Sequence, residues 1–537
     1  MSGAVLVALL ASCAPEGENT QPELILLSPR EQLIRASVDL RGVHPSEEEL
    51  LAIEASPGLY ADFVDRYIDD PRFIERTREV FNQRFLTRTG STYGQDPGGA
   101  TGDQIAAAIG DEPLRLLSYI VDNDLPYSEL VLAPYTVASP LLAEVWGLER
   151  EAGDGWTLAH YTDGRPEAGI LTMNGVWFRY PSMGGNANRH RANAVSKMLL
   201  CDDYLSRPIV LNRAAVDQLT IDPEAAISEN PGCQSCHATL DPLSAHFFGF
   251  FPTDLEDNTF DGVYRPEQEG NWRMYADKEP GFYGTPTNGI PELAAQLSDD
   301  PRFIDCAVQT VFEGFTQSSL DDDDWSRFQD LRAAFVDSNQ SIRTTVRELV
   351  LSDAYRAAGS LDPDLDAQVS GVRVASPAQL SGIISGITGY SWQFNGTDGL
   401  LDYGTGLPVL LGGIDGDTVT ERSYEPSVGA VFIQERLAQS AAWHVADHDL
   451  DPSRSDDARM LAYVTHDSRP DTDAEAFDTQ IRSLYLQATG LPLDEDADEP
   501  EALAQLWEQL YALEASPTAA WAGVVSAVLR DPRVLTY

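Results

Sequence analysis

The sequence predicts a mainly α protein, a multi-domain helical chain in which helical repeats flank a central unit. Its length of 537 residues exceeds that of one ordinary domain. Capping boxes and Asp-Pro pairs precede several stretches that have apolar residues at helical spacing. In addition, residues 54–72 resemble residues 514–533, and a shorter echo lies at residues 299–303, which indicates a repeated pair of helices.

Residues 1–21 are predicted to form an export signal and tether. The apolar run over residues 4–11 is too short to span a membrane. It leads into Leu10-Ala11-Ser12-Cys13, which resembles the lipobox of bacterial lipoproteins, so we expect lipid on Cys13 to anchor the chain to a membrane. The Ala14 that follows favours the outer membrane of a Gram-negative bacterium. A disordered apolar tail is the alternative, because no Lys or Arg precedes the run.

Residues 22–150 are predicted to form an N-terminal helical domain. Ser28 with Glu31 and Ser46 with Glu49 have the spacing of capping boxes. Asp70 followed by Pro71 is typical of the start of a further helix. Such helices usually form a packing scaffold, so a structural role is expected for this part of the chain.

Residues 151–359 are predicted to form the central domain, which contains the sequence Cys233-Gln234-Ser235-Cys236-His237. The C-x-x-C-H spacing is the attachment signature of c-type haem. Two thiols would form thioethers with the haem vinyl groups, and His237 would bind the iron from one face. A zinc half-site is less favoured because no second C-x-x-C or His pair follows at finger spacing. A redox dithiol or a short structural disulfide would also place two cysteines at this spacing.

The sequence does not single out one residue as the second iron ligand. Met274 is the first candidate, because it lies downstream at a separation plausible for a small cytochrome. The alternatives are a water-bound or empty position and four further side chains: Met173, Met183, His190 and His246. Arg189 and Arg191 could contact the haem propionates, although a solvated helix face is the favoured interpretation.

The remaining cysteines suit the same oxidising compartment. If Cys13 carries lipid, and Cys233 and Cys236 carry haem, Cys201 and Cys306 are left as an even pair. We therefore predict a Cys201–Cys306 disulfide that ties the helix before the haem segment to the helix after it. Two buried free thiols are the alternative.

Residues 360–537 are predicted to form a C-terminal helical domain that follows a linker at residues 361–366. The Asp415-Gly416-Asp417 turn lacks the continuation of a calcium-binding EF-hand. His444 and His448 lie one helical turn apart, but no zinc-hydrolase pattern joins them, so exposed histidines are favoured over a metal site.

Charge limits the classes of partner. The chain has 36 basic and 85 acidic residues and a formal net charge of −49. Such a surface repels nucleic acid and anionic lipid head groups, so no nucleic-acid partner is expected. It would suit a basic redox partner protein or a saline habitat, and an acidic surface that simply keeps the protein in solution is the favoured interpretation.

Several segments together resemble a known group of proteins. They are Ala168-Gly169-Ile170-Leu171-Thr172, then Arg179-Tyr180-Pro181, the run at residues 188–192, C-x-x-C-H-A-x-x-D-P from Cys233, and Gly262-Val263-Tyr264-Arg265-Pro266. This order is similar to large exported planctomycete-type cytochrome c proteins, which are haem-binding proteins of unknown function. Residues 35–42 and the Asp-Pro-Arg-Phe helix start resemble the domain that precedes the haem unit in such chains. The resemblance implies one covalent haem in a mostly helical envelope protein and supplies no substrate.

These observations favour a c-type cytochrome lipoprotein of the cell envelope with one covalent haem, which exchanges electrons with a partner protein. A haem-dependent peroxidase-like or oxidative enzyme component is the second hypothesis, so enzymatic activity is left open. A non-redox surface scaffold with a structural C-x-x-C is the third. No P-loop, dinucleotide fingerprint or nucleophile elbow is present in the sequence.

Overall fold

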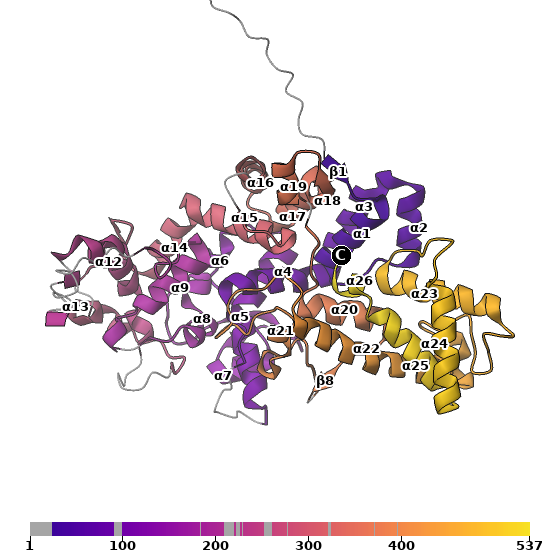
Figure 1. The fold of residues 1–537 in the computed structure, drawn as a ribbon. Coiled ribbons are helices and arrows are strands. Elements are labelled where there is room, and N and C mark those ends of the chain that lie inside the picture. Colours follow the sequence, from indigo (N-terminus) through magenta and orange to yellow (C-terminus); the bar gives the residue numbers. More distant parts are fainter. Residues whose placement is uncertain are drawn as a thin grey trace, which may run out of the picture.

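The computed structural model describes residues 24–537 except for residues 91–98, 183, 209–219, 222–225, 228, 252–259, 276–277, 321–323, 370 and 395. The described chain is mainly helical, which confirms the predicted fold class. The molecule is elongated: helices α12 (Pro231–Ser244) and α13 (Trp272–Tyr275) lie at one end, and α24 (Glu499–Glu514) and α25 (Pro517–Leu529) lie at the other (Figure 1).

The N-terminal helices begin where the sequence predicts them. Both expected capping boxes form, and in each the serine hydroxyl accepts from a backbone N–H while the glutamate accepts from the serine N–H. The Asp70 carboxylate caps the helix that starts at Pro71. The first elements are β1 (Leu24–Leu26), α1 (Pro29–Arg41), α2 (Glu47–Ala55), η1 (Pro57–Leu59), α3 (Tyr60–Ile68), α4 (Pro71–Phe85), α5 (Gly102–Asp122), α6 (Glu129–Leu132), β2 (Thr136–Ala138), α7 (Pro140–Trp146) and β3 (Glu149–Arg150).

The central part is built from short helices around the segment with the two free cysteines. The helix that begins at Arg189 ends at Leu200, because Cys201 adopts a left-handed conformation with φ of 52°. The remaining elements here are β4 (Thr157–His160), η2 (Gly169–Thr172), α8 (Asn174–Arg179), η3 (Gly184–Asn186), α9 (Arg189–Leu200), η4 (Ala245–Phe250), η5 (Pro266–Asn271), β5 (Gly281–Phe282), β6 (Thr285–Pro286), α14 (Ile290–Ser298), α15 (Pro301–Thr316), α16 (Trp325–Asp337), α17 (Ile342–Leu351), α18 (Asp353–Arg356) and β7 (Ala357–Ser360).

The C-terminal part is a helical bundle in which α22 and α24 pack on α25. It also contains a small hairpin, β8 paired with β9, between its first two long helices. Its other elements are α19 (Pro363–Val369), α20 (Pro377–Thr388), β8 (Gln393–Phe394), β9 (Thr397–Asp398), η7 (Tyr403–Thr405), α21 (Leu407–Leu410), α22 (Val428–Asp449), η8 (Pro452–Asp457), α23 (Ala474–Thr489) and α26 (Pro532–Leu535).

Two large hydrophobic cores organise the described chain. The first draws on residues from Leu33 to Tyr355 and therefore joins the N-terminal helices and the central part in one core. The second contains residues from Val374 to Leu535 together with Ile34, Val38 and Leu50 of the N-terminal helices. Helix α1 thus contributes side chains to both cores, which fixes the two parts relative to each other.

A buried polar cluster also joins the two parts. The Asp39 carboxylate, which is 1% exposed, accepts hydrogen bonds from the hydroxyls of Tyr355 and Tyr537 and pairs with the Arg373 guanidinium. Backbone hydrogen bonds between Arg373 and Tyr537 hold the last residue in place. Strands β1 and β7 pair antiparallel nearby, with Leu24 opposite Ser360.

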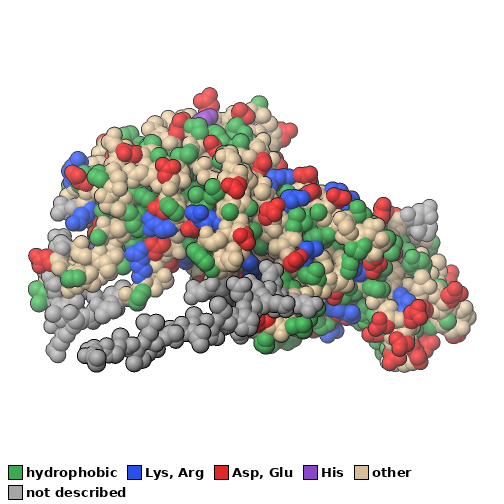
Figure 2. All heavy atoms as spheres, turned by 90° about the horizontal axis from the view of Figure 1, so that it is seen from above, with side chains coloured by type: hydrophobic (Ala, Val, Ile, Leu, Met, Phe, Trp, Pro, Cys, Tyr) green, Lys and Arg blue, Asp and Glu red, His purple; other side chains and the backbone are tan. Residues whose placement is uncertain are grey.

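The described surface carries both signs of charge. On the face drawn in Figure 2, basic and acidic side chains are interspersed over the middle of the molecule, and acidic side chains gather at the end formed by the C-terminal helices. Residues 494–501 of that region include six acidic residues. None of the described helices has the length and apolar character needed to cross a bilayer.

Candidate functional site

The two cysteines and the histidine of the C-x-x-C-H motif lie in the first two turns of α12. Asn230 caps this helix, because its side-chain oxygen accepts from the N–H of Gly232 at 3.0 Å. Cys233 and Cys236 are free thiols that are partly exposed. Residues three and four apart share a helix face, so Cys233, Cys236 and His237 form one group on the helix surface.

A buried carboxylate fixes the His237 ring. Asp241, one turn further along α12, accepts a hydrogen bond from Nδ1 of His237 at 2.9 Å. An ionised carboxylate only accepts, so Nδ1 carries a proton, and in the neutral form of the ring the lone pair lies on Nε2. Among the described residues, no hydrogen-bond partner faces Nε2. The His237 side chain is 22% exposed, which leaves this nitrogen accessible.

Arg189 of helix α9 holds the same carboxylate from the other side. Its Nε and Nη2 atoms donate to the two Asp241 oxygens at 2.6 and 3.2 Å. Burial alone would raise the pKa of Asp241, but the hydrogen bonds from His237 and Arg189 outweigh it and hold the pKa below its usual range. The carboxylate is therefore ionised, and it couples α9 to the imidazole of α12. Asp241 was not among the site residues predicted from the sequence, although its position four residues after His237 on a helix was a usable signal.

Arg189 and Arg191 do not lie on a solvated face, contrary to the favoured interpretation. Arg191 is fully buried, and it donates to the backbone carbonyls of Tyr180 and Phe250 at 3.2 and 3.0 Å. Burial lowers the pKa of Arg191 to about 9. Arg191 thus joins α9 to η4, and Arg189 neutralises Asp241.

The candidates for a second iron ligand lie in very different surroundings. Met274, on α13, is 71% exposed. Met173 is buried in the first core. His190 is exposed, and its Nδ1 atom lies 3.2 Å from the carbonyl oxygen of Pro181. Met183 and the predicted lipidation site Cys13 lie outside the described residues.

His246 is engaged at both of its ring nitrogens. Its Nδ1 donates to the Leu243 carbonyl at 3.0 Å, and its Nε2 accepts from the Thr287 hydroxyl. Burial lowers its pKa to about 4, so the ring is neutral at ordinary pH. Binding a metal through His246 would require one of these hydrogen bonds to break.

Cys201 and Cys306 form a disulfide, as predicted from the sequence. Their Cα atoms are 5.2 Å apart, and the bond closes a separation of 105 residues. It joins the end of α9 to α15, and α9 packs against both α12 and α15. The bridge therefore fixes the helix that carries Arg189 beside α15, and packing places the same helix beside the one that carries His237.

The other candidate metal ligands in the sequence are the histidines of α22 and the turn at Asp415, and the described residues there do not form a metal site. His448 donates from Nδ1 to Asp449 at 2.8 Å, and its ring stacks on that of His444 with 6.4 Å between the ring centroids. The Asp415 carboxylate accepts from its own turn, including the N–H groups of Asp417, Thr418 and Val419. Within the described part of the chain, no group of three or more His, Cys, Asp or Glu side chains could hold a metal ion.

No protein-family model, curated protein or solved structure matches the chain.

Proposed function

We propose that the protein is a cell-envelope cytochrome of a Gram-negative bacterium, lipid-anchored through Cys13, that carries one covalent haem c and transfers electrons to or from a partner protein. The observation that carries the proposal is the arrangement on α12. Two free thiols and an imidazole share one helix face, and the imidazole has its Nδ1 proton held by Asp241. This donor set fits covalent haem c, which needs two cysteine thiols for the thioether bonds and one neutral imidazole nitrogen for the iron.

Each residue has a defined part in this proposal. Cys233 and Cys236 would form the thioether bonds, and Nε2 of His237 would bind the iron. Asp241 keeps the proton on Nδ1, orients the ring and increases the basicity of the ligand nitrogen, as carboxylates hydrogen-bonded to metal-binding histidines do. Haem c supplies one-electron chemistry when bound, and the protein sets its potential through these contacts.

The decisive experiment is expression of the full chain with a c-type maturation system, followed by haem staining of the denatured protein and a pyridine-haemochrome spectrum. We expect covalent haem in the wild type and none in the Cys233→Ala/Cys236→Ala variant. The matched control is Cys201→Ala/Cys306→Ala, which also removes two cysteines and should retain the stain. A wild-type chain whose mass equals that of the bare polypeptide after co-expression would contradict the proposal and favour a structural C-x-x-C.

A haem-dependent oxidative enzyme is a second candidate, and two observations support it. Met274 is largely exposed, and both ring nitrogens of His246 are engaged. An iron without a second protein ligand would be five-coordinate and open to peroxide or another small ligand. The absorption spectrum of the ferric protein separates the candidates: a six-coordinate low-spin spectrum supports electron transfer, and a high-spin spectrum that changes on addition of cyanide supports catalysis.

The lipid anchor is tested separately. Growth of the expressing cells with a radiolabelled fatty acid should label the wild-type protein and leave Cys13→Ala unlabelled. The Cys13→Ala protein should also appear in the soluble envelope fraction. Equal labelling of both proteins would exclude Cys13 as the acylated residue.

A further inference from the structure

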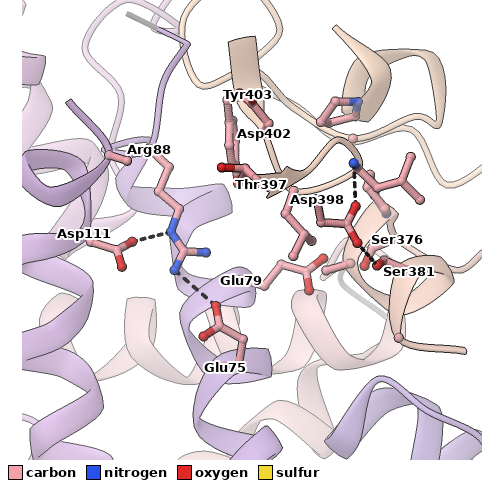
Figure 3. A pocket seen from close by; sticks show the side chains of 18 of the residues that line it. Glu75, Glu79, Arg88, Asp111, Ser376, Ser381, Thr397, Asp398, Asp402 and Tyr403 are labelled. Carbon is pink, nitrogen blue, oxygen red and sulfur yellow. Dashed lines mark hydrogen bonds and ion pairs between the residues drawn. The ribbon is translucent and has the colours of Figure 1, made fainter. Parts of the chain in front are cut away.

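A cavity of about 1600 Å³ lies between the N-terminal helices and the C-terminal part. Helices α4 and α5 form one wall; α20, the β8–β9 hairpin and the loop that follows it form the other (Figure 3). Typical sites for small molecules have volumes of about 300–1000 Å³. The cavity is thus large enough for an oligomeric ligand. In Figure 1 its walls lie near the middle of the molecule, away from α12 at the end.

One wall is the charged face of an amphipathic helix. Residues at positions 72, 75, 76, 79 and 83 of α4 share a face that lines the cavity. The opposite face of α4 packs into the first core through Phe73, Val80 and Phe81. A charged helix face normally lies in water. Here the C-terminal part covers only some of it: Arg76 is 4% exposed, whereas the side chains of Arg72 and Glu75 are 48% and 52% exposed.

Enclosing these charges has an energetic cost that packing alone does not explain. Removing charged groups from water costs several kcal/mol each unless they are well paired, and an apolar contact between the two parts would avoid that cost. Ion pairs within the wall offset part of the cost. Arg88 Nε lies 2.6 Å from Asp111, Arg88 Nη2 lies 3.2 Å from Glu75, and Arg115 Nη2 lies 3.0 Å from Asp111.

These pairs decide which ligand charge the cavity accepts. Five of the six arginines that line it are already paired with a carboxylate: Arg41, Arg72, Arg76, Arg88 and Arg115. Burial would raise the pKa of Asp111, but its two arginines lower it below the usual range, so this pair network is ionised. An anionic ligand would have to displace a carboxylate, and the net charge of −49 opposes its approach.

The opposite wall carries two carboxylates that accept hydrogen bonds and form no ion pair in the described part of the chain. Asp398 accepts from the hydroxyls of Ser381 and Ser391 at 2.5 and 2.8 Å and from the N–H of Leu400 at 2.8 Å. Asp402 accepts from the N–H of Gly404 at 2.9 Å. Neither carboxylate has an ion-pair partner in the described part of the chain. Since a carboxylate has about four acceptor positions, both can accept further hydrogen bonds from hydroxyl groups.

Aromatic side chains supply flat apolar surfaces in this polar cavity. Phe394 of the hairpin is 42% exposed, and its ring centroid lies 5.9 Å from that of Trp392. Trp156 lines the other wall, where the Arg115 guanidinium lies 4.8 Å from its ring centroid. In Figure 3, Glu79 from α4 and Asp398 from β9 extend into the same space from opposite walls.

We propose that this cavity binds a neutral oligosaccharide. Such a ligand presents hydroxyls that both donate and accept, so it can bond to the free acceptor positions of Asp398 and Asp402 and to the arginine N–H groups without breaking the ion pairs. Its ring faces carry C–H groups that pack on aromatic side chains. The proposal does not depend on haem, because the residues that carry it lie outside α12.

The test is isothermal titration of the full chain with cellohexaose, xylohexaose, mannohexaose and maltohexaose, with glucose as a size control and hexagalacturonate as a charge control. We expect one of the neutral hexasaccharides to bind, glucose to give no heat, and hexagalacturonate to bind more weakly. Asp398→Asn, Asp402→Asn and Phe394→Ala should each weaken binding about tenfold or more, because each removes a charge-assisted acceptor or an aromatic surface.

Two matched variants serve as controls. Asp467→Asn replaces a carboxylate that is 96% exposed, and Phe432→Ala replaces a ring that is 63% exposed on α22; neither side chain lines the cavity. Both should bind like the wild type. The proposal is overturned if no neutral hexasaccharide binds, if hexagalacturonate binds more tightly than all of them, or if the binding isotherm is the same for the wild type, Asp402→Asn and Phe394→Ala. Circular dichroism melting of every variant checks that the fold is retained.

Discussion

At the scale of single residues, Asp241 links the imidazole of His237 to the guanidinium of Arg189. It is 1% exposed, it accepts from the imidazole of His237 and from the guanidinium of Arg189, and no other carboxylate in the described chain contacts His237. A carboxylate on Nδ1 increases electron donation from the opposite ring nitrogen. The pair His237–Asp241 thereby determines both the tautomer and the basicity of the ring.

We therefore expect Asp241→Asn to raise the reduction potential of the haem-loaded protein by tens of millivolts. An amide still fits the space, but it carries no charge and donates less electron density through the ring. Spectroelectrochemical titration measures the shift. Asp467→Asn, an exposed change of the same kind, is the control and should leave the potential unaltered. A potential that is equal in both variants and the wild type would show that Asp241 has no influence on the ring.

At the scale of elements, the sequence Asp-Pro-Arg forms the same helix start three times. In α4, α15 and α26 the aspartate caps the helix, proline occupies the first turn, and the arginine side chain returns to the aspartate in a two-pronged ion pair. In α15, Arg302 donates to Asp300 at 2.9 and 2.6 Å. One short sequence thus determines where a helix begins, how its first N–H groups are satisfied and where the arginine lies.

We expect Asp300→Ala to speed amide hydrogen exchange in the first turn of α15 about fivefold, which corresponds to the loss of about 1 kcal/mol for a cap. Asp300→Asn keeps an amide oxygen that can cap the helix and should exchange nearly as the wild type does. Exchange rates that are identical in the alanine variant and the wild type would rule out a stabilising cap.

The same cap should lose its effect in acid. Burial would raise the pKa of Asp300, but the hydrogen bond from Arg302 and that from the backbone lower it below the usual range. A group whose pKa is lowered on folding stabilises the fold above its unfolded pKa of about 3.9. That contribution is lost as the pH falls through the lower, folded value. The difference in the free energy of local opening between the wild type and Asp300→Ala, measured by amide hydrogen exchange, should therefore be largest at neutral pH and become smaller in strong acid.

At the scale of the whole molecule, the polar cluster around Asp39 connects the two cores. Asp39 lies on α1, Tyr355 closes the first core, and Arg373 and Tyr537 belong to the C-terminal part. Burial and the neighbouring Asp39 charge raise the pKa of Tyr355 well above its usual value, so its hydroxyl remains a donor. A buried carboxylate is stabilised only while all of its hydrogen-bond donors are in place. Removing one donor leaves part of its negative charge away from water and without a partner.

Tyr537→Phe should therefore lower the thermal midpoint of the protein, with a loss of about 1–3 kcal/mol for the missing donor to a buried charge. Differential scanning calorimetry is the measurement. Tyr463→Phe, at a tyrosine that is 53% exposed, is the matched control and should melt as the wild type does. If both variants melt at the same temperature, the cluster contributes nothing to the joining of the two parts.

Local sequence predicted the local structure of this chain well. The capping boxes at Ser28 and Ser46, the Asp-Pro helix starts, the mainly α class and the Cys201–Cys306 bridge all follow from neighbouring residues or from the pairing of cysteines. The burial of Arg191 was missed, because one of the carbonyls that it binds, that of Phe250, comes from η4, more than fifty residues away in the chain. The cavity was missed for the same reason: Glu79 and Asp398 meet only after two cores have formed. The domain limits, the haem and the lipid stay predictions.

The two kinds of cysteine make opposite demands on biosynthesis. Cys201 and Cys306 form a disulfide, so they have to be oxidised, whereas under the proposed function Cys233 and Cys236 would have to remain reduced until haem is attached. A chain refolded in air from a reducing cytoplasm has no such order of events, and any two of its five thiols can then form a wrong disulfide. Recombinant material is therefore best made by secretion, with oxidation at the α9–α15 junction and delivery of the cofactor in the same compartment.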